Sequence, residues 1–286
     1  METTIALLCV SFLLLAPALA AGTPVDPAPA EGKPATTDPA PSVTALIASA
    51  IDRGVPLFND GDHEGCARVY ADTARELLRR GDAELSRLDR HELETALAEP
   101  APDASTRAWN LRYAFDRILD NERFEALVEA PLPEGFPGPG PLGRVVVKEY
   151  PKYRAARAEG GNSFWTLFQH INRNDVKMTA PVEMTMNDEM REVEMAFLYE
   201  GPEQGAAGID GRVKVLDLEP LTVLSVGLRG RRNADAVELA RDWIEDQMKR
   251  EGWCKAGAWR TFGYNSPMVP ASRSFWELQL PVTRCP

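Results

Sequence analysis

The sequence is poor in the residues that most often perform catalysis or hold metals. It has 3 histidines and 4 cysteines among its 286 residues. It contains no Gly-x-Ser-x-Gly, no glycine-rich phosphate loop and no His-Glu-x-x-His, which are typical of serine hydrolases, nucleotide-binding enzymes and zinc peptidases. The sequence therefore favours a binding protein over an enzyme.

A surplus of positive charge is also lacking. The formal net charge is −11; residues 142–286 hold 20 basic and 20 acidic side chains, and residues 42–128 hold 11 basic and 17 acidic ones. Nucleic acids and anionic membrane surfaces are bound through clusters of Lys and Arg. Neither half of the chain offers such a cluster, so we predict no nucleic-acid partner.

One long apolar run is present, at the N-terminus. It spans Ile5–Leu15 and is too short to cross a bilayer, which takes about 20 residues. Ala18-Leu19-Ala20 follows with a small-x-small cleavage pattern, which predicts a signal peptide over residues 1–21, a secreted or periplasmic protein, and no membrane span after cleavage. Glu2 departs from this pattern because a basic residue is usual there, so a frayed cytosolic N-terminus is the alternative. Residues 22–41, rich in Pro and Ala, predict a flexible tether.

Signal removal would leave three cysteines, an odd number. In an oxidising compartment this predicts one disulfide and one free thiol. Cys254 follows the last long predicted helix and Cys285 lies next to the C-terminus, so a bond between them would stabilise the fold by about 3–4 kcal/mol. Three free thiols are the alternative. His63 and Cys66 stand at a metal-ligand spacing, but no second pair accompanies them, so we expect Cys66 to be a small core residue.

Residues 42–128 have the apolar spacing of helices and predict a small all-α bundle. Breaks occur at Asn59–Asp62, at Gly81-Asp82 and at Pro100–Pro102. The apolar residues expected in its last helix are Trp109, Leu111, Tyr113, Phe115, Ile118 and Leu119. Residues 129–141, rich in Pro and Gly, mark the predicted boundary to a second domain over residues 142–286.

The second half of the chain repeats one order of predicted elements. Strands are expected at 145–150 and 153–158, a helix at 163–172, strands at 177–186, 193–199, 213–218 and 222–229, a helix at 234–250, and strands at 258–264 and 274–282. Two strand–strand–helix–strand–strand units predict an antiparallel sheet curled into an open, distorted β-barrel with two flanking helices. With the bundle before it, the chain is predicted to be α+β.

Two motifs carry a family resemblance. The first is Lys177-Met178-Thr179-Ala180-Pro181-Val182, preceded by the aromatic helix Phe164-Trp165-Thr166-Leu167-Phe168. The second is Tyr264-Asn265-Ser266-Pro267-Met268-Val269-Pro270, followed by Arg273-Ser274-Phe275-Trp276-Glu277. In this order they resemble the SOUL haem-binding protein family over about residues 142–286. The resemblance implies a distorted barrel with two helices and pseudo-twofold symmetry, and the binding of haem or a related tetrapyrrole.

Haem is a flat apolar plate with two propionates, so a site for it requires an apolar slot and basic groups. The slot is predicted on the first helix and the strands beside it, and the basic groups between them. The predicted residues are Phe164, Leu167, Phe168, Ile171, Met178, Met184 and Met195 for the plate, and Arg173 and Lys177 for the propionates. The alternative is that the apolar residues are core and the cations belong to a solvated turn. Cys-x-x-Cys-His is absent, which excludes covalent c-type haem.

His170 is the only imidazole in this half of the chain, so it is the one histidine that could be an axial ligand to iron. Its helical position lies about 60° or more from the Leu167–Ile171 stripe, so it flanks the apolar face. The family resemblance does not assign an axial histidine here, and a site that binds haem without His170 stays open.

Two other functions stay open. An enzyme acting on a lipophilic or tetrapyrrole ligand in the same barrel would require a carboxylate or tyrosine in the pocket, such as Glu183 or Tyr264. Otherwise we expect Glu183 and Glu277 to face solvent. A protein-interaction module that has lost its ligand would show a filled barrel and an exposed apolar patch on the helical bundle, which would bind a protein partner.

Overall fold

The computed structural model describes residues 40–286, in which helices come first and a sheet follows. The predicted signal peptide (1–21) and all but the last two residues of the predicted tether (22–41) lie outside the described residues. None of the helices in residues 40–286 is long and apolar enough to span a membrane.

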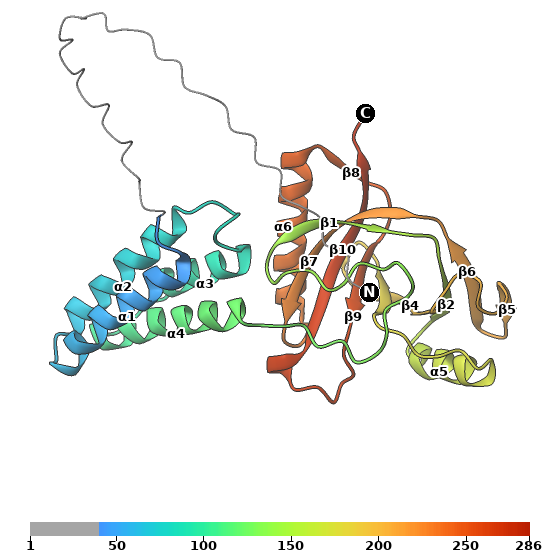
Figure 1. Cartoon of the computed structure of the whole chain (residues 1–286), viewed down its shortest axis with the longest axis horizontal. Helices are drawn as coiled ribbons and strands as arrows, with labels where there is room; N and C mark the ends of the chain where they lie inside the picture. Colours follow the sequence, from blue (N-terminus) through green and yellow to red (C-terminus); the bar gives the residue numbers. More distant parts are fainter. Residues whose placement is uncertain (1–39) are drawn as a thin grey trace, which may run out of the picture. The chain divides into compact units, whose positions relative to one another are not determined.

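The helical part contains α1 (Val43–Asn59), α2 (His63–Leu78), α3 (Arg87–Ala98) and α4 (Ala104–Glu122), shown in blue to green in Figure 1. Each follows a Ser or Asp whose side chain accepts a backbone N–H from the first turn. The four helices share one apolar core, in which Leu77 and Phe115 are fully buried. Two predicted apolar residues of α4 lie at the surface instead, since Trp109 and Tyr113 are 45% and 53% exposed.

The sheet part contains ten strands and two long helices. In chain order these are β1 (Val145–Tyr150), β2 (Tyr153–Glu159), α5 (Ser163–Arg173), β3 (Val182–Met186), β4 (Glu192–Leu198), β5 (Gly208–Asp210), β6 (Val213–Leu218), β7 (Leu221–Arg229), α6 (Ala234–Glu251), β8 (Trp253–Lys255), β9 (Trp259–Gly263) and β10 (Phe275–Arg284). A 3₁₀ turn over Ala271–Arg273 precedes β10. The sequence did not predict β5 and β8, because a strand of three residues is too short to show a period of two.

The sheet is antiparallel and its strand order confirms the predicted duplication. Neighbouring strands follow the order β1-β7-β10-β9-β3-β4-β2-β6-β5, with β8 beside β10. Exchanging β1, β2, β3 and β4 with β6, β7, β9 and β10, respectively, reverses the order of those eight strands and leaves every pair of neighbours unchanged. The end strands β1 and β5 do not pair with each other, so the curled sheet is an open, distorted barrel. The predicted α+β fold is therefore confirmed.

Both long helices of this part lie on one face of the sheet, which we call the outer face. Directly paired residues in antiparallel strands point to the same side. One such row runs through Trp276, Gly263, Val182, Phe197 and Ala156. Trp276, at one end of the row, packs in the core under α6, and Ala156, at the other end, packs in the core under α5. The two helices thus cover opposite ends of the outer face and leave the middle strands between them (Figure 1).

The opposite side, the inner face, is covered by residues 123–141, which connect α4 to β1 and which we call the strap. Figure 1 shows the strap in green, running from α4 along the sheet. The N–H of Ala180 donates to the carbonyl oxygen of Pro131 at 3.0 Å, and the N–H of Gly140 donates to Glu277 at 2.5 Å. The predicted boundary segment 129–141 is thus hydrogen-bonded to the sheet along its length.

Strand β3 begins later than predicted. The expected strand covered 177–186, whereas β3 begins at Val182. Pro181 has no N–H to donate to a neighbouring strand, and the N–H of Ala180 donates to the strap. The motif Lys177–Val182 therefore connects α5 to the sheet and, at the same time, holds the strap.

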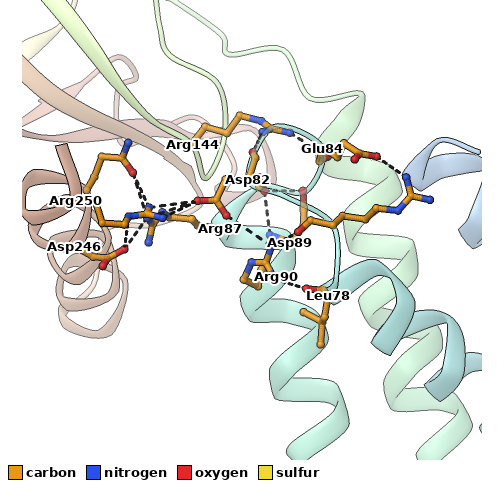
Figure 2. A network of polar contacts seen from close by, with 12 residues as sticks. Leu78, Asp82, Glu84, Arg87, Asp89, Arg90, Arg144, Asp246 and Arg250 are labelled. Carbon is orange, nitrogen blue, oxygen red and sulfur yellow. Dashed lines mark hydrogen bonds and ion pairs between the residues drawn. The ribbon is translucent and has the colours of Figure 1, made fainter. Parts of the chain in front are cut away.

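Charged side chains join the helical part to the sheet part, as Figure 2 shows. Arg87 of α3 donates to Asp246 of α6 at 2.7 Å, and Arg250 of α6 donates to Asp82 at 3.2 Å. Arg144, just before β1, donates to the backbone carbonyl oxygen of Asp82. Half-exposed ion pairs of this kind contribute about 0–1 kcal/mol each, so they stabilise the contact only modestly.

Candidate functional site

The predicted aromatic helix forms as α5, and its side chains divide into a buried and an exposed set. Leu167 and Ile171 are 0% and 3% exposed and lie in the core against the sheet. Phe164, Trp165 and Phe168 are 39%, 58% and 37% exposed. The rings of Phe164 and Phe168 are 6.1 Å apart and within 8° of parallel. One turn of α5 therefore presents a cluster of aromatic rings to solvent.

This exposed edge of α5 continues onto the outer face of β3 and β4. The ring of Phe164 lies 5.3 Å from that of Phe197. Phe197 pairs with Val182 across the strands, and Met195 pairs with Met184 two residues along. We call this surface the aromatic–methionine patch, and it consists of Phe164, Phe168, Met178, Val182, Met184 and Met195. The two phenylalanines are exposed, and the other four residues are partly buried.

A cation that the sequence analysis missed lies at the edge of this patch. Arg232, in the turn before α6, donates to the sulfur of Met184 at 3.3 Å and to the hydroxyl of Thr261 at 2.5 Å. It also pairs with Glu192 at 3.2 Å, and its side chain is 29% exposed. Its position directly before the helix cap is visible in the sequence, but no local pattern shows that it reaches β3.

The two cations predicted for the propionates are more exposed. The side chains of Arg173 and Lys177 are 65% and 80% exposed. Arg173 pairs with Asp210 at 2.9 Å, and the ammonium of Lys177 lies 3.8 Å from Glu200. Arg173 therefore faces β5, and Lys177 adds an exposed charge next to the patch residue Met178.

His170 is 3% exposed, and both of its ring nitrogens have partners. Nδ1 lies 2.7 Å from a carboxylate oxygen of Asp210, and Nε2 lies 2.9 Å from the hydroxyl of Tyr199. The hydrogen bond from His170 and the charge of Arg173 lower the pKa of Asp210, which therefore stays a carboxylate and accepts a hydrogen bond from Nδ1–H. Ligation of iron by His170 stays a prediction, and it would require the ring to give up at least one of these partners.

The inner face carries a parallel row of paired residues: Glu277, Phe262, Glu183, Ala196 and Arg157. Glu183 and Glu277 are 2% and 0% exposed. The expectation that both face solvent is therefore wrong. The charges remain inside because each carboxylate is matched by donors from the sheet and, for Glu277, from the strap.

Donors reach both oxygens of Glu277. The ammonium of Lys148 donates to Oε1 at 2.6 Å, and the N–H of Gly140 donates to the same atom at 2.5 Å. The hydroxyl of Tyr264 and the amide of Gln279 donate to Oε2 at 3.2 and 2.7 Å. Burying an ion costs several kcal/mol, and such a shell of donors offsets that cost. Glu277 therefore ties the strap to the middle of the sheet.

Glu183 has a comparable shell. Arg157 donates to Oε1 at 2.8 Å, and Arg260 and Tyr153 donate to Oε2 at 3.3 and 3.1 Å. Arg260 is 4% exposed, and its guanidinium lies 4.4 Å from the ring centroid of Phe262. Both inner-face carboxylates are thus occupied by structural partners.

The strap closes the inner face over these groups. Phe136 is 9% exposed, and its ring centroid lies 4.9 and 5.2 Å from those of Tyr150 and Tyr153. Burial raises the pKa of Tyr153 to about 12, and it raises the pKa of Tyr150 and Tyr264 as well. In the part of the chain that the structure describes, neither inner-face carboxylate is accessible to a ligand while the strap is in place.

The structure joins Cys254 and Cys285, the predicted pair, with Cα atoms 5.1 Å apart. Cys66 is a free, buried thiol in the bundle core. The ring of His63 stacks on Phe58 at 4.4 Å. Within residues 40–286, no group of three or more His, Cys, Asp or Glu side chains is arranged to hold a metal ion.

Comparison with known proteins gives one family and several distant structures. No curated protein matches the chain. The C-terminal domain of EcmrR is 14% identical over 50% of this chain and 98% of its own, with a TM-score of 0.39. A hydrolase from Listeria innocua is 14% identical over 50% of this chain and 94% of its own, with a TM-score of 0.40. Such distant likenesses support no inference about the function of this chain.

The family match is independent of those structures. Residues 143–277 match the family described as SOUL heme-binding protein. The matched range contains α5, the motif Lys177–Val182, the second motif Tyr264–Glu277 and the whole aromatic–methionine patch. The predicted resemblance to the SOUL heme-binding protein family is therefore confirmed over residues 143–277.

Proposed function

We propose that the SOUL domain binds haem or a related tetrapyrrole non-covalently on the aromatic–methionine patch. The observation that supports this most is the exposure of the aromatic rings of α5, since Phe164, Trp165 and Phe168 are 39%, 58% and 37% exposed. Large apolar side chains gathered at one exposed place are typical of ligand or partner surfaces. The family match supplies the class of ligand.

The residues of the patch suit a flat apolar ligand with a charged edge. The nearly parallel rings of Phe164 and Phe168 offer apolar contact, and the methionine side chains beside them are flexible enough to adapt to a plate. Arg232 is a partly exposed guanidinium at the edge, and a guanidinium binds carboxylates such as propionates in a bidentate manner. A bound tetrapyrrole would supply its own redox and ligand-binding chemistry, while these side chains hold and orient it.

The inner face supports this assignment by contrast. Glu183 and Glu277 point to the opposite side of the sheet from the patch, as the strand register requires. Both are engaged by buried cations and hydroxyls, and two interior carboxylates would repel propionates. We therefore propose binding on the outer face rather than catalysis in the barrel.

The test is a haemin titration of the whole protein, followed by Soret absorbance. Replacing Phe164 and Phe168 together by Ala removes both aromatic rings of the patch, so we expect haemin to bind at least about tenfold more weakly. Tyr113→Ala is the matched control, because Tyr113 is an aromatic residue of α4 that is 53% exposed and lies outside the patch. Equal affinity of the double variant and the wild type would overturn the proposed site.

Two further substitutions test the polar groups in the same titration. Arg232→Gln should weaken haemin binding, whereas Glu192→Gln should strengthen it, because Glu192 now competes for Arg232. His170→Gln tests axial ligation. An unchanged Soret maximum and affinity in His170→Gln would show that the protein binds haem without this side chain.

We also infer that the protein is exported to an oxidising compartment. The N-terminal pattern predicts cleavage near residue 21, and the bond between Cys254 and Cys285 suits a secreted or periplasmic protein. N-terminal sequencing of protein purified from its native cells, combined with thiol labelling, tests this. An uncleaved N-terminus with four reactive thiols in the unfolded protein would contradict it.

A further inference from the structure

The helical bundle contains a cavity of its own, between α1, α2 and α4. It encloses about 200 Å³. Val55 and Trp109 are 38% and 45% exposed and mark its mouth, whereas Cys66 and Tyr70 are 1% and 3% exposed and mark its inner end. The remaining lining residues are Phe58, Asn59, Ala108 and Arg112. The cavity lies outside the SOUL domain and is far too small for a tetrapyrrole.

Aromatic rings form the outer wall of this cavity. The ring of Trp109 lies 5.7 Å from that of Phe58 in an edge-to-face arrangement and 5.5 Å from that of Tyr113. Because the tryptophan ring is nearly half exposed, it contributes less hydrophobic stabilisation to the bundle than a fully buried ring would. Beside an open cavity, the same ring offers a face for an aromatic guest.

The inner end of the cavity is rigid and uncharged. A Cβ atom at Gly54 would lie 2.3 Å from the ring of Tyr70, so glycine at this position allows Tyr70 to lie directly against α1. Burial raises the pKa of Tyr70 and of the Cys66 thiol, so both stay protonated at neutral pH. A ligand would therefore meet a fixed hydroxyl and a thiol there, without a competing negative charge.

Arg112 supplies the one positive charge of the lining. Its Nε donates to both oxygens of Asp116 at 3.0 and 3.1 Å, and its side chain is 29% exposed. Because Nε faces Asp116, the outer N–H groups of the fork stay oriented for a second acceptor. A carboxylate is the acceptor that this geometry binds best.

We propose that the bundle cavity binds a small aromatic carboxylate, with its ring beside Phe58 and Trp109 and its carboxylate at Arg112. A dry apolar cavity of about 150 Å³ binds benzene, so a cavity of about 200 Å³ has room for one ring with one polar group. The site is independent of the patch on α5, and the chain would then carry two ligand sites of different size and charge preference.

The experiment compares three ligands of equal shape and different charge: benzoate, benzamide and benzamidine. Binding to the whole protein is measured by ligand-observed NMR or calorimetry. We expect benzoate to bind most tightly and benzamidine most weakly, because the guanidinium of Arg112 faces the polar end of the ligand. Equal affinity for the three ligands, a preference for benzamidine, or no saturable binding of any of them would overturn the proposal.

Two substitutions at one ion pair separate a binding role from a structural one. Arg112→Gln and Asp116→Asn both break the same pair between residues four apart on α4, so both should lower the melting temperature slightly. Their effects on benzoate should be opposite. Arg112→Gln should weaken benzoate binding by about two- to fivefold, and Asp116→Asn should strengthen it by a similar factor. Changes of the same sign in both variants would contradict the assigned role of Arg112.

A third substitution tests the location of the site. Val55→Trp fills the mouth of the cavity from an exposed position, so it should abolish benzoate binding without unfolding the bundle. Val147→Trp, at a position of β1 that is 45% exposed, is the control and should bind benzoate as the wild type does. Unchanged binding in Val55→Trp would place the ligand elsewhere and overturn the proposal.

Discussion

The two faces of the curled sheet use charge and apolar area in opposite ways. The inner face buries the carboxylates of Glu183 and Glu277, together with the cations that pair with them, under the strap. The outer face buries apolar side chains under α5 and α6 but leaves Phe164 and Phe168 of α5 more than one-third exposed. Charged groups are thus buried on the inner face, whereas two aromatic rings stay in contact with water on the outer face.

This contrast indicates a division of roles. Paired buried charges contribute little net stability, but removal of one partner is costly, so they fix one arrangement of strap and sheet. Exposed aromatic side chains forgo about 1–2 kcal/mol of burial each, a cost that is recovered when a ligand covers them. We interpret the inner face as the part that holds the fold together and the outer face as the part that is kept available for a ligand.

The largest effect should follow from breaking the buried pair of the inner face. Glu277→Gln leaves the ammonium of Lys148, whose side chain is 6% exposed, without its counter-charge. We expect the free energy of unfolding to fall by about 3–5 kcal/mol in denaturant titrations. Glu192→Gln, which breaks a pair with Arg232 on the outer face at 33% and 29% exposure, should cost less than about 1 kcal/mol. Similar losses in the two variants would show that the faces do not differ.

A somewhat smaller effect should follow from loosening the strap. Phe136→Ala removes a ring that packs on Tyr150 and Tyr153, and we expect a loss of about 3 kcal/mol in the free energy of unfolding. Because the strap has no regular secondary structure, its residues should also become sites of limited proteolysis in this variant. A stable, protease-resistant Phe136→Ala protein would mean that the strap is not held by this ring.

The sequence predicted the elements of the sheet part well, because each is recorded in local periodicity. The helix with Leu167 and Ile171 on one stripe and the two strand–strand–helix–strand–strand units needed no knowledge of distant contacts. Cap residues are equally local, and Asn233 and Gly252 cap the two ends of α6. Family motifs added the fold and the class of ligand.

The sequence could not predict which face of the sheet is covered by other parts of the chain. A period of two places Glu183 and Glu277 on a common side, but their burial depends on the strap, which precedes them by more than 40 residues. Arg232 was missed for a similar reason, since its contacts with β3 and β9 span 29 to 48 residues. Long-range contacts, rather than local propensity, decide which polar residues are inside.

A third way to test the inner face is to titrate its tyrosines. Burial raises the pKa of Tyr153 to about 12, whereas a tyrosine in the unfolded chain titrates near pH 10. Between these pH values the folded protein retains a proton that the unfolded chain has lost. Stability is therefore fully present below about pH 10 and falls as the pH rises toward 12, by up to about 2.7 kcal/mol.

Denaturant titrations at about pH 9 and about pH 11 measure how much the free energy of unfolding falls with rising pH. Tyr153→Phe should make this slope smaller. Burial also raises the pKa of Tyr150 and Tyr264, so part of the pH dependence of the free energy of unfolding should remain in that variant. Tyr113→Phe, on the exposed side of α4, is the control. A slope unchanged by Tyr153→Phe would mean that this hydroxyl is not buried in the folded state.

The smallest effect on stability should come from the patch itself. Phe168→Ala removes the same side chain as Phe136→Ala, but Phe168 is 37% exposed and its loss creates no enclosed cavity, so we expect less than about 1.5 kcal/mol in the free energy of unfolding. The same substitution should weaken haemin binding, whereas Phe136→Ala, measured under conditions where it is folded, should not. A loss near 3 kcal/mol in Phe168→Ala would make this ring part of the core, and the outer face would then be a second structural surface rather than one kept for a ligand.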